Sequence, residues 1–285
     1  MGFFETFWSW LGSQLATYIG NNTARLSAAL EPAVVTLATV YVMAWGWLQM
    51  TGRINEPFAV GLKRILTLVV VLGVALRLWL YNSIIVDTFY SAPAELAAAI
   101  IGTSNPVGTI DDIWQHGGAV ADLLWNKGGV FDGDAGFYLA GILVWILMGL
   151  LCVYTMFLIA LSSIALAALL ALGPLFIVML LFDGTRRLFD SWLMQLTNYA
   201  LVTILTVLLA ALLLQIVDSY AAQTAARGTA ILTVDALDML LVTVLVLLVM
   251  RQVMPIAASL AGGGSLSTLS TVSRGLSWLM RRLPQ

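Results

Sequence analysis

The sequence predicts an all-α, polytopic helical membrane protein with about five transmembrane helices, amphipathic N- and C-terminal helices and a long central extracytoplasmic loop. Hydrophobic residues make up 61% of the 285 residues and charged residues only 10%, and the mean hydropathy is +0.97. Soluble domains contain about 45–50% apolar and about 25% charged residues. The run from Tyr138 to Phe182 has no charged residue, histidine, asparagine or glutamine, so it needs a bilayer as solvent. Apolar residues come in blocks rather than in alternation, which disfavours a β-barrel.

Residues 1–30 are predicted to form an N-terminal amphipathic helix in the membrane interface. Within residues 3–20, apolar side chains recur on one helical face and polar side chains occupy the other. A helix that docks on a partner protein is the competing interpretation. No Lys or Arg precedes Arg25, so the positive region of a signal peptide is missing. The apolar face contains Phe4, Phe7, Trp8, Leu11, Leu15 and Tyr18.

Residues 31–86 are predicted to contain the first two transmembrane helices, at roughly 32–50 and 65–86. Pro32 suits the first turn of the first helix, where a missing N–H costs nothing. Arg77 lies inside the second helix, close to Trp79 and Tyr81. We expect its side chain to reach the nearby headgroups, and a polar contact inside an assembly is the alternative. The connector and the start of the second helix carry Arg53, Lys63 and Arg64.

Residues 87–137 form the predicted acidic central loop, placed in the periplasm. Its aromatic residues argue against plain disorder. His116, with Asp111 and Asp112, offers the best candidate for acid–base chemistry, but no second ligand or nucleophile is spaced to join it. With one histidine and one cysteine, Cys152, in the chain, we expect no catalytic residue, no metal site and no cofactor.

Residues 138–255 are predicted to form a bundle of transmembrane helices. The first run is either one long tilted helix or two spans with a turn near Ser162 and Ser163. Ser163, Ala167 and Ala171 repeat at four-residue intervals, a spacing that lets helices approach closely. This pattern suits self-association and packing within the chain equally well. Gly173 and Pro174 follow directly, so we expect the helix to bend there.

Gln195 and Asn198 are the main polar side chains that enter a span, and we expect them to form helix–helix hydrogen bonds. They follow a basic and aromatic cluster of Arg186, Arg187 and Trp192. A last span is predicted at roughly 236–250. Residues 256–285 then read as a cytoplasmic amphipathic tail with basic residues beside a leucine repeat.

The distribution of Lys and Arg does not decide the number of spans. Five spans with a periplasmic N-terminus place most basic residues in the cytoplasm, and six spans with a cytoplasmic N-terminus place nearly as many there. The basic group around the first two spans favours five, because that region usually dominates orientation. Both arrangements leave the tail in the cytoplasm, and they differ in the side on which residues 87–137 lie.

The stretch Gly173-Pro174-Leu175-Phe176, continued by Phe182, Thr185-Arg186, Leu188-Phe189, Trp192 and Asn198, resembles the TrbL-type polytopic inner-membrane subunit of bacterial type IV secretion systems. The resemblance implies a homo-oligomer in the bacterial inner membrane, in contact with lipids. It also implies, as partners, other inner-membrane and periplasmic secretion subunits, the minor pilin and the cytoplasmic ATPases, with transient contact with translocating DNA or protein. Arg186, Arg187 and Trp192 would stabilise the fold or its interfaces at the membrane boundary.

The leading hypothesis is therefore a non-catalytic channel or assembly-platform subunit. A secondary transporter or small-solute channel is the second hypothesis, and it would need a polar site near the middle of the bilayer. A membrane-embedded enzyme is the third, with His116, Asp111 and Asp112 as its best candidates.

Overall fold

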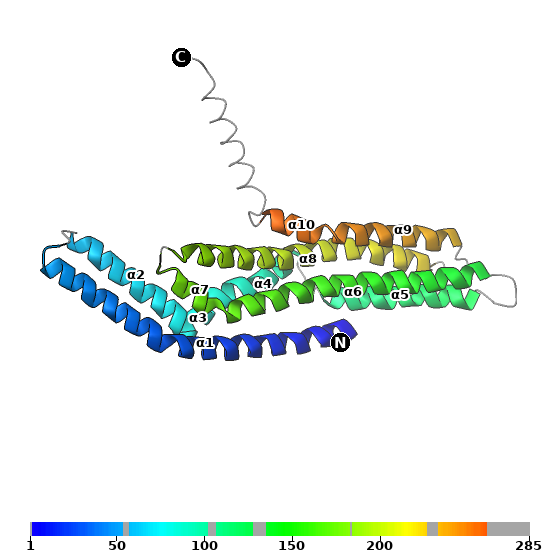
Figure 1. The fold of residues 1–285 in the computed structure, drawn as a ribbon. Coiled ribbons are helices and arrows are strands. Elements are labelled where there is room, and N and C mark those ends of the chain that lie inside the picture. Colours follow the sequence, from blue (N-terminus) through cyan, green and yellow to red (C-terminus); the bar gives the residue numbers. More distant parts are fainter. Residues whose placement is uncertain are drawn as a thin grey trace, which may run out of the picture. The chain divides into compact units, whose positions relative to one another are not determined.

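The computed structural model describes residues 2–53, 57–101, 107–127, 135–182, 184–226 and 233–260. Throughout these ranges the chain forms helices joined by turns, without strands (Figure 1). The predicted all-α class is confirmed. The described ranges contain 4 helices that are long and apolar enough to cross a bilayer, or up to 5 if one bent pair counts as a span. The four belong to α1 (Phe3–Met50), α6 (Ala135–Ala171), α8 (Arg186–Ala226) and the stretch Leu237–Ala258.

The stretch Leu237–Ala258 comprises most of α9 (Thr233–Met250) and all of α10 (Val253–Ala258). The other helices are shorter or more polar: α2 (Phe58–Leu76), α3 (Leu78–Tyr81), the π-helix η1 (Asn82–Ser91), α4 (Ala92–Ile101), α5 (Gly108–Lys127) and α7 (Gly173–Met179). The chain divides into two compact units. The first unit contains Met1–Gly12, Pro93–Ser163 and Asn198–Gln285, and the second contains Ser13–Ala92 and Ile164–Thr197.

The first unit has an apolar core built from α5, the N-terminal part of α6, the C-terminal part of α8 and α9. α5 runs antiparallel to α6, because Trp125 packs on Gly141 near one end and Trp114 packs on Gly149 further along. Thr203 of α8 donates a hydrogen bond to the Ser162 hydroxyl of α6 at 3.0 Å. These contacts join α5 and α8 to α6 at the core.

The segment predicted as a central loop is largely helical where it is described. α5 covers 20 of its residues, with apolar or small side chains at helical spacing on the buried face: Ile110, Ile113, Gly117, Val120, Ala121 and Leu124. The acidic residues of this stretch mask that spacing in the sequence, because they make the segment look solvated. Residues 102–106 and 128–134, also within the predicted loop, lie outside the described ranges.

The second unit contains a helical hairpin of α1 and α2. Trp45 of α1 packs on Gly61 of α2, and the Ser27 hydroxyl of α1 donates to the Ala75 carbonyl at 3.2 Å. Gly52 lies in the connecting turn with a φ of 68°, a left-handed conformation that glycine adopts without steric cost. The end of α6, α7 and the start of α8 complete the unit.

α1 is one continuous helix of 48 residues, where the sequence suggested an interfacial helix followed by a separate span. Pro32 lies inside it. An interior proline removes one backbone donor and crowds the carbonyl four residues earlier, whereas the preceding Ala28, Ala29, Leu30 and Glu31 are strong helix formers. The predicted division at residue 30 therefore does not coincide with the end of an element.

The second predicted span bends sharply at Arg77. This residue has an extended backbone between α2 and α3, and Val60–Leu76 meets Leu78–Ile100 at 86°. The Arg77 N–H still bonds the Gly73 carbonyl at 3.0 Å. Its side chain is exposed, which agrees with either of the two interpretations of Arg77 in the sequence.

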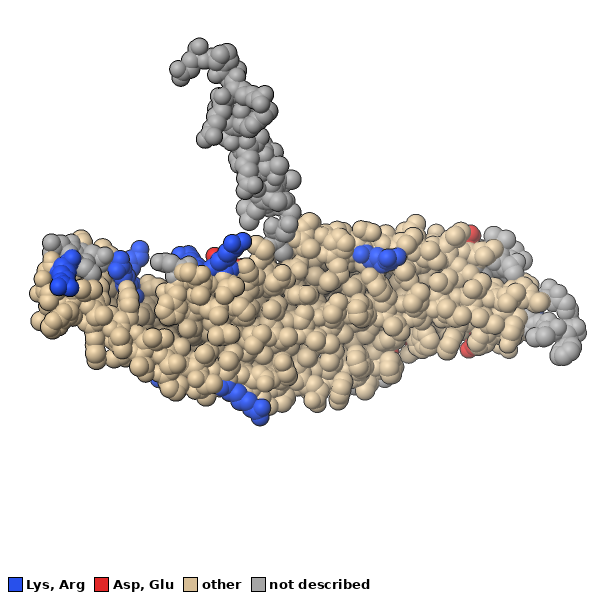
Figure 2. Space-filling model, in the orientation of Figure 1, with Lys and Arg blue, Asp and Glu red and all other residues tan. Residues whose placement is uncertain are grey.

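Charged side chains occupy a few separate patches on the face shown in Figure 2, and most of that face is uncharged. The exposed large hydrophobic side chains occur on all the long helices, as expected of surfaces that lie against lipid or other membrane subunits. The amphipathic tail predicted at residues 256–285 falls outside the described residues after position 260.

Candidate functional site

The break between α6 and α7 is the centre of the candidate site, and it lies in the second unit. α6 ends at Ala171, and α7 begins at Gly173 with Pro174 in its first turn. Pro174 has no N–H, so the carbonyl of Leu170, four residues earlier, loses the donor that a continuous helix would supply. In a bilayer no water is at hand to replace such a donor. The break therefore requires donors from elsewhere in the protein.

Two side chains from distant parts of the sequence supply those donors. The hydroxyl of Tyr81, which follows α2 by one helical turn, donates to the carbonyl of Leu170. The indole Nε1–H of Trp192 in α8 donates to the carbonyl of Leu169 at 2.9 Å. Tyr81 is fully buried and Trp192 is 2% exposed. We call Tyr81, Leu169, Leu170, Gly173 and Trp192 the break cluster.

Gly173 is required by the close approach of Tyr81. A Cβ atom at this position would lie 1.9 Å from the tyrosine hydroxyl oxygen and 2.8 Å from the ring carbon Cε2. Trp192 is held between two phenylalanines: its ring stacks on Phe176 at 5.8 Å and 12°, and it contacts Phe189 at 5.7 Å. Trp192 thus packs inside the second unit and does not point to lipid.

Arg186 and Arg187 lie in the first turn of α8, and both are exposed. Basic residues at a helix N-terminus oppose the helix dipole, so they do not stabilise this helix end. No ion pair of either arginine occurs among the described residues. Their exposure at the start of an apolar span is typical of residues that set orientation across the membrane.

The predicted small-residue stripe is buried. Ser163 belongs to the first unit, and its hydroxyl donates to the carbonyl of Ile159 in its own helix at 3.0 Å. Ala167 and Ala171 belong to the second unit, and both are buried. In the sequence they lie close to Leu169 and Leu170 of the break cluster. Each of these residues is covered within the chain, so the stripe offers no free surface for a second copy.

Gln195 and Asn198 form no helix–helix hydrogen bond with any described residue. Gln195 is exposed, and the buried Oδ1 of Asn198 has no described donor. Gln195 lies nine residues into α8 from Arg186, which corresponds to about 13 Å along the helix axis. An exposed amide within an apolar candidate span is available for a hydrogen bond with a partner outside the described chain.

The candidate acid–base residues of the first unit do not form one site. Asp111 is buried, and its carboxylate accepts the N–H groups of Phe4 at 3.1 Å and of Glu5 at 2.9 Å, which caps the start of α1. His116 instead pairs through Nδ1 with Asp218 of α8. Asp112 is exposed. The structure thus assigns structural contacts to two of the three.

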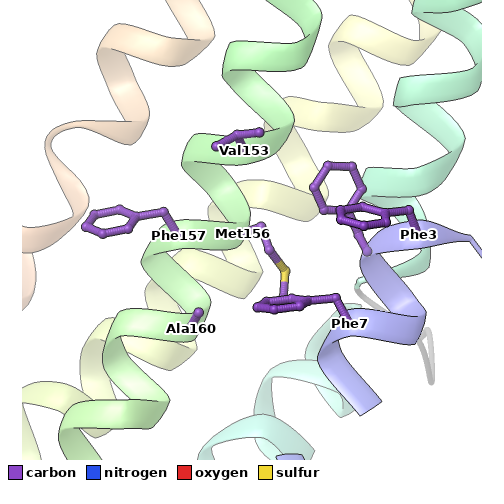
Figure 3. A pocket seen from close by; sticks show the side chains of 7 residues that line it. Phe3, Phe7, Val153, Met156, Phe157 and Ala160 are labelled. Atoms are coloured by element: carbon purple, nitrogen blue, oxygen red, sulfur yellow. The ribbon is translucent and has the colours of Figure 1, made fainter. Parts of the chain in front are cut away.

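A cavity of about 310 Å³ lies beside the capped start of α1, also within the first unit (Figure 3). Phe3 and Phe7 approach it from α1, and Met156 approaches it from α6. The side chains that line it are all apolar, so they offer no charged or hydrogen-bonding group. The remaining lining residues are Phe4, Val153, Phe157 and Ala160.

Sequence reasoning identified Gly173, Pro174 and Trp192 but missed Tyr81. The signal for Tyr81 is indirect: a proline in an apolar run leaves one carbonyl free, and only a distant donor can bond it. Nothing in the local sequence shows which tyrosine, serine or tryptophan provides that donor. The residue therefore appears only once the fold is known.

Comparison with known proteins bears on the same region. The family model of the TrbL/VirB6 plasmid conjugal transfer protein matches residues 38–253, which include the whole break cluster. The chain belongs to the TrbL/VirB6 family. This confirms the family suggested by the sequence around Gly173 and Trp192.

Individual members of the family are distant relatives. The chain is 23% identical over 223 residues to the type IV secretion system protein VirB6 of Bartonella quintana (strain Toulouse), covering 75% of this chain and 67% of that protein. The VirB6 protein of Bartonella henselae is 22% identical with the same coverage. The VirB6 protein of Brucella abortus biovar 1 is 27% identical over 199 residues, covering 66% of this chain and 57% of that protein.

Proposed function

We propose that the chain is a non-catalytic inner-membrane subunit of a type IV secretion system, which oligomerises to form part of the substrate translocation path and the pilus assembly platform. The observation that carries this proposal is the family match over residues 38–253. The partners are other copies of the chain, the other inner-membrane and periplasmic secretion subunits, the minor pilin and the cytoplasmic ATPases. Translocating DNA or protein makes transient contact.

The break cluster supports a scaffolding role. Tyr81 and Trp192 join the region after α2 and the start of α8 to the end of α6, so three segments distant in sequence meet at one point. All the polar groups named there are satisfied within the chain. Such an arrangement keeps helices in fixed relative positions, which a platform for other subunits needs.

The exposed amide of Gln195 supports association with another membrane helix. The residue lies in a candidate span, and its neighbours Leu188 and Met194 are exposed and apolar. A hydrogen bond from a neighbouring subunit would remove the cost of an amide that faces hydrocarbon. We place the N-terminus in the periplasm and the tail in the cytoplasm, with Arg186 and Arg187 at the cytoplasmic boundary.

The proposal is tested by purifying the tagged protein from cells that lack or co-express the other secretion subunits. Native mass spectrometry in mild detergent should give a homo-oligomer, and co-expression should give a larger complex with the other subunits. Deletion of the gene should abolish substrate transfer, and the intact gene should restore it. A monomer under both conditions, with transfer unaffected by the deletion, would refute the proposal.

A secondary transporter remains the second candidate, because the helix breaks at Arg77 and at Gly173 resemble the discontinuous helices of transporters. In transporters the freed carbonyls coordinate ions. Here Ser27 bonds the Ala75 carbonyl and Tyr81 bonds the Leu170 carbonyl, which leaves these two oxygens occupied. Proteoliposomes that contain the purified chain should show no saturable uptake of ions or small solutes, and saturable uptake would favour the transporter.

A further inference from the structure

We propose that the polar face of α5 lines a water-filled space that the assembled subunits enclose at the depth of the membrane. The inference rests on the proposed function, because a subunit of a translocation path needs one side that faces water. We define the polar face of α5 by its exposed residues, none of which is a large apolar side chain: Asp112, Gln115, His116, Ala119, Asp122 and Asn126.

The orientation of α5 is fixed by its opposite face. Ile110, Val120 and Leu124 are fully buried against the core of the first unit. Trp125 packs so closely on α6 that a Cβ at Gly141 would lie 2.6 Å from its Cδ1. The helix cannot rotate without breaking these contacts, so its polar face must point out of the unit.

The depth of α5 follows from one chain of contacts. A Cβ at Gly117, in the middle of α5, would lie 2.9 Å from Cγ of Met148 in α6. The sulfur of the same Met148 accepts the Thr243 hydroxyl of α9 at 3.7 Å. Thr243 lies inside the candidate span Leu237–Ala258. The middle of α5 is therefore level with a part of α9 that is suited to the bilayer.

At this level the other helices of the unit present a different surface. Within one helical turn of Met148, α6 exposes Ile146 and Leu150, and within one turn of Thr243, α9 exposes Leu241 and Leu245. Leu241 is 68% exposed. Such side chains suit lipid, whereas the carboxylates of α5 are costly in hydrocarbon. At this level the exposed surfaces of α6 and α9 thus suit lipid, whereas the exposed surface of α5 suits water.

The charge of the polar face predicts which solutes the space favours. Asp112 and Asp122 carry negative charge, and His116 is matched by Asp218 of α8. Lys127, at the end of α5, lies over the ring of Phe137. The two exposed aspartates therefore give this face an acidic character, which favours cations over anions.

The test is the reactivity of single cysteines in inner-membrane vesicles that contain the complete secretion complex. With Cys152→Ala as background, Gln115→Cys, Ala119→Cys and Asn126→Cys report the polar face, and Ile146→Cys and Leu245→Cys are controls at matched depth. A cationic, membrane-impermeant methanethiosulfonate should modify the α5 cysteines about tenfold faster than the controls or more, because a thiol in apolar surroundings stays protonated.

The charge is tested at Ala119→Cys by comparing that reagent with an anionic methanethiosulfonate. Asp122→Asn should lower the ratio of the cationic to the anionic rate by about twofold, since exposed charges interact weakly. If Asp122→Asn left the ratio of the cationic to the anionic rate unchanged, the polar face of α5 would not be acidic at this position.

Three results would overturn the water-lined face: α5 cysteines as unreactive as the controls, controls as reactive as α5, or α5 cysteines that react only when partner subunits are absent. Substrate transfer and native mass are measured on the same vesicles. An assembled, transfer-competent complex with an unreactive α5 refutes only this inference, whereas a chain that never joins the complex refutes the proposed function.

Discussion

The hydroxyl of Tyr81 should contribute measurably to stability only because Pro174 follows the end of α6. In Tyr81→Phe the ring remains and the Leu170 carbonyl loses its donor inside a buried site. An orphaned buried acceptor costs about 1–3 kcal/mol, and hydrogen bonds measured inside bilayers reach about 1.7 kcal/mol at most. We therefore expect a loss of about 1–2 kcal/mol in the free energy of unfolding, measured by far-UV circular dichroism during titration of mild detergent with dodecyl sulfate.

A double-mutant cycle with Pro174→Ala tests the reason for that loss. Alanine restores an N–H that can donate to Leu170, so Tyr81→Phe should cost about 0.5 kcal/mol or less in this background. Tyr138→Phe is the matched control, because Tyr138 is 41% exposed and its ring contact with Trp125 survives the change. Equal costs of Tyr81→Phe in both backgrounds, or no cost in the wild type, would refute the reasoning about the break.

The same titration checks two further variants of the break cluster, and hydrogen exchange checks a third in the first unit. Trp192→Phe keeps an aromatic ring but removes the donor to Leu169, and should cost about 1 kcal/mol; a variant as stable as wild type would show that this bond is dispensable. Gly173→Ala should cost about 2 kcal/mol or more, because the added Cβ meets the buried Tyr81 ring, and a neutral effect would contradict the close packing. Asp111→Ala should speed amide exchange in the first turn of α1 several-fold, whereas Asp112→Ala should not; similar exchange in both variants would argue against the cap.

The fold class could be predicted from composition because a bilayer imposes a strong condition on residue type. The interruption of the helix at Gly173 and Pro174 was also predictable, since proline acts locally. Element boundaries were harder where the local sequence carries mixed signals. Pro32 is tolerated inside α1, and the acidic residues of α5 conceal an apolar face that only its packing on α6 makes clear.

The sequence predicts the helix break at the candidate site but not the side chains that donate hydrogen bonds to it. Pro174 indicates from the sequence that the Leu170 carbonyl lacks a backbone donor. The residue that supplies the donor, Tyr81, lies 89 positions from Leu170 in the sequence. Trp192 was expected at the membrane boundary as a tryptophan beside arginines, and its burial depends on Phe176 and Phe189. Contacts of that kind are set by tertiary packing, which no local pattern encodes. The helix–helix hydrogen bond expected of Gln195 stays a prediction.

The break cluster also has a consequence for biogenesis. A chain synthesised from its N-terminus presents Tyr81 before Leu170 emerges, but Leu169 must wait for Trp192, 23 positions later. One carbonyl at the end of α6 can therefore be bonded as soon as it enters the membrane, and the other only after α8 has begun to insert. The segment between Leu169 and Trp192 therefore separates the two earliest points in synthesis at which these neighbouring carbonyls can be bonded.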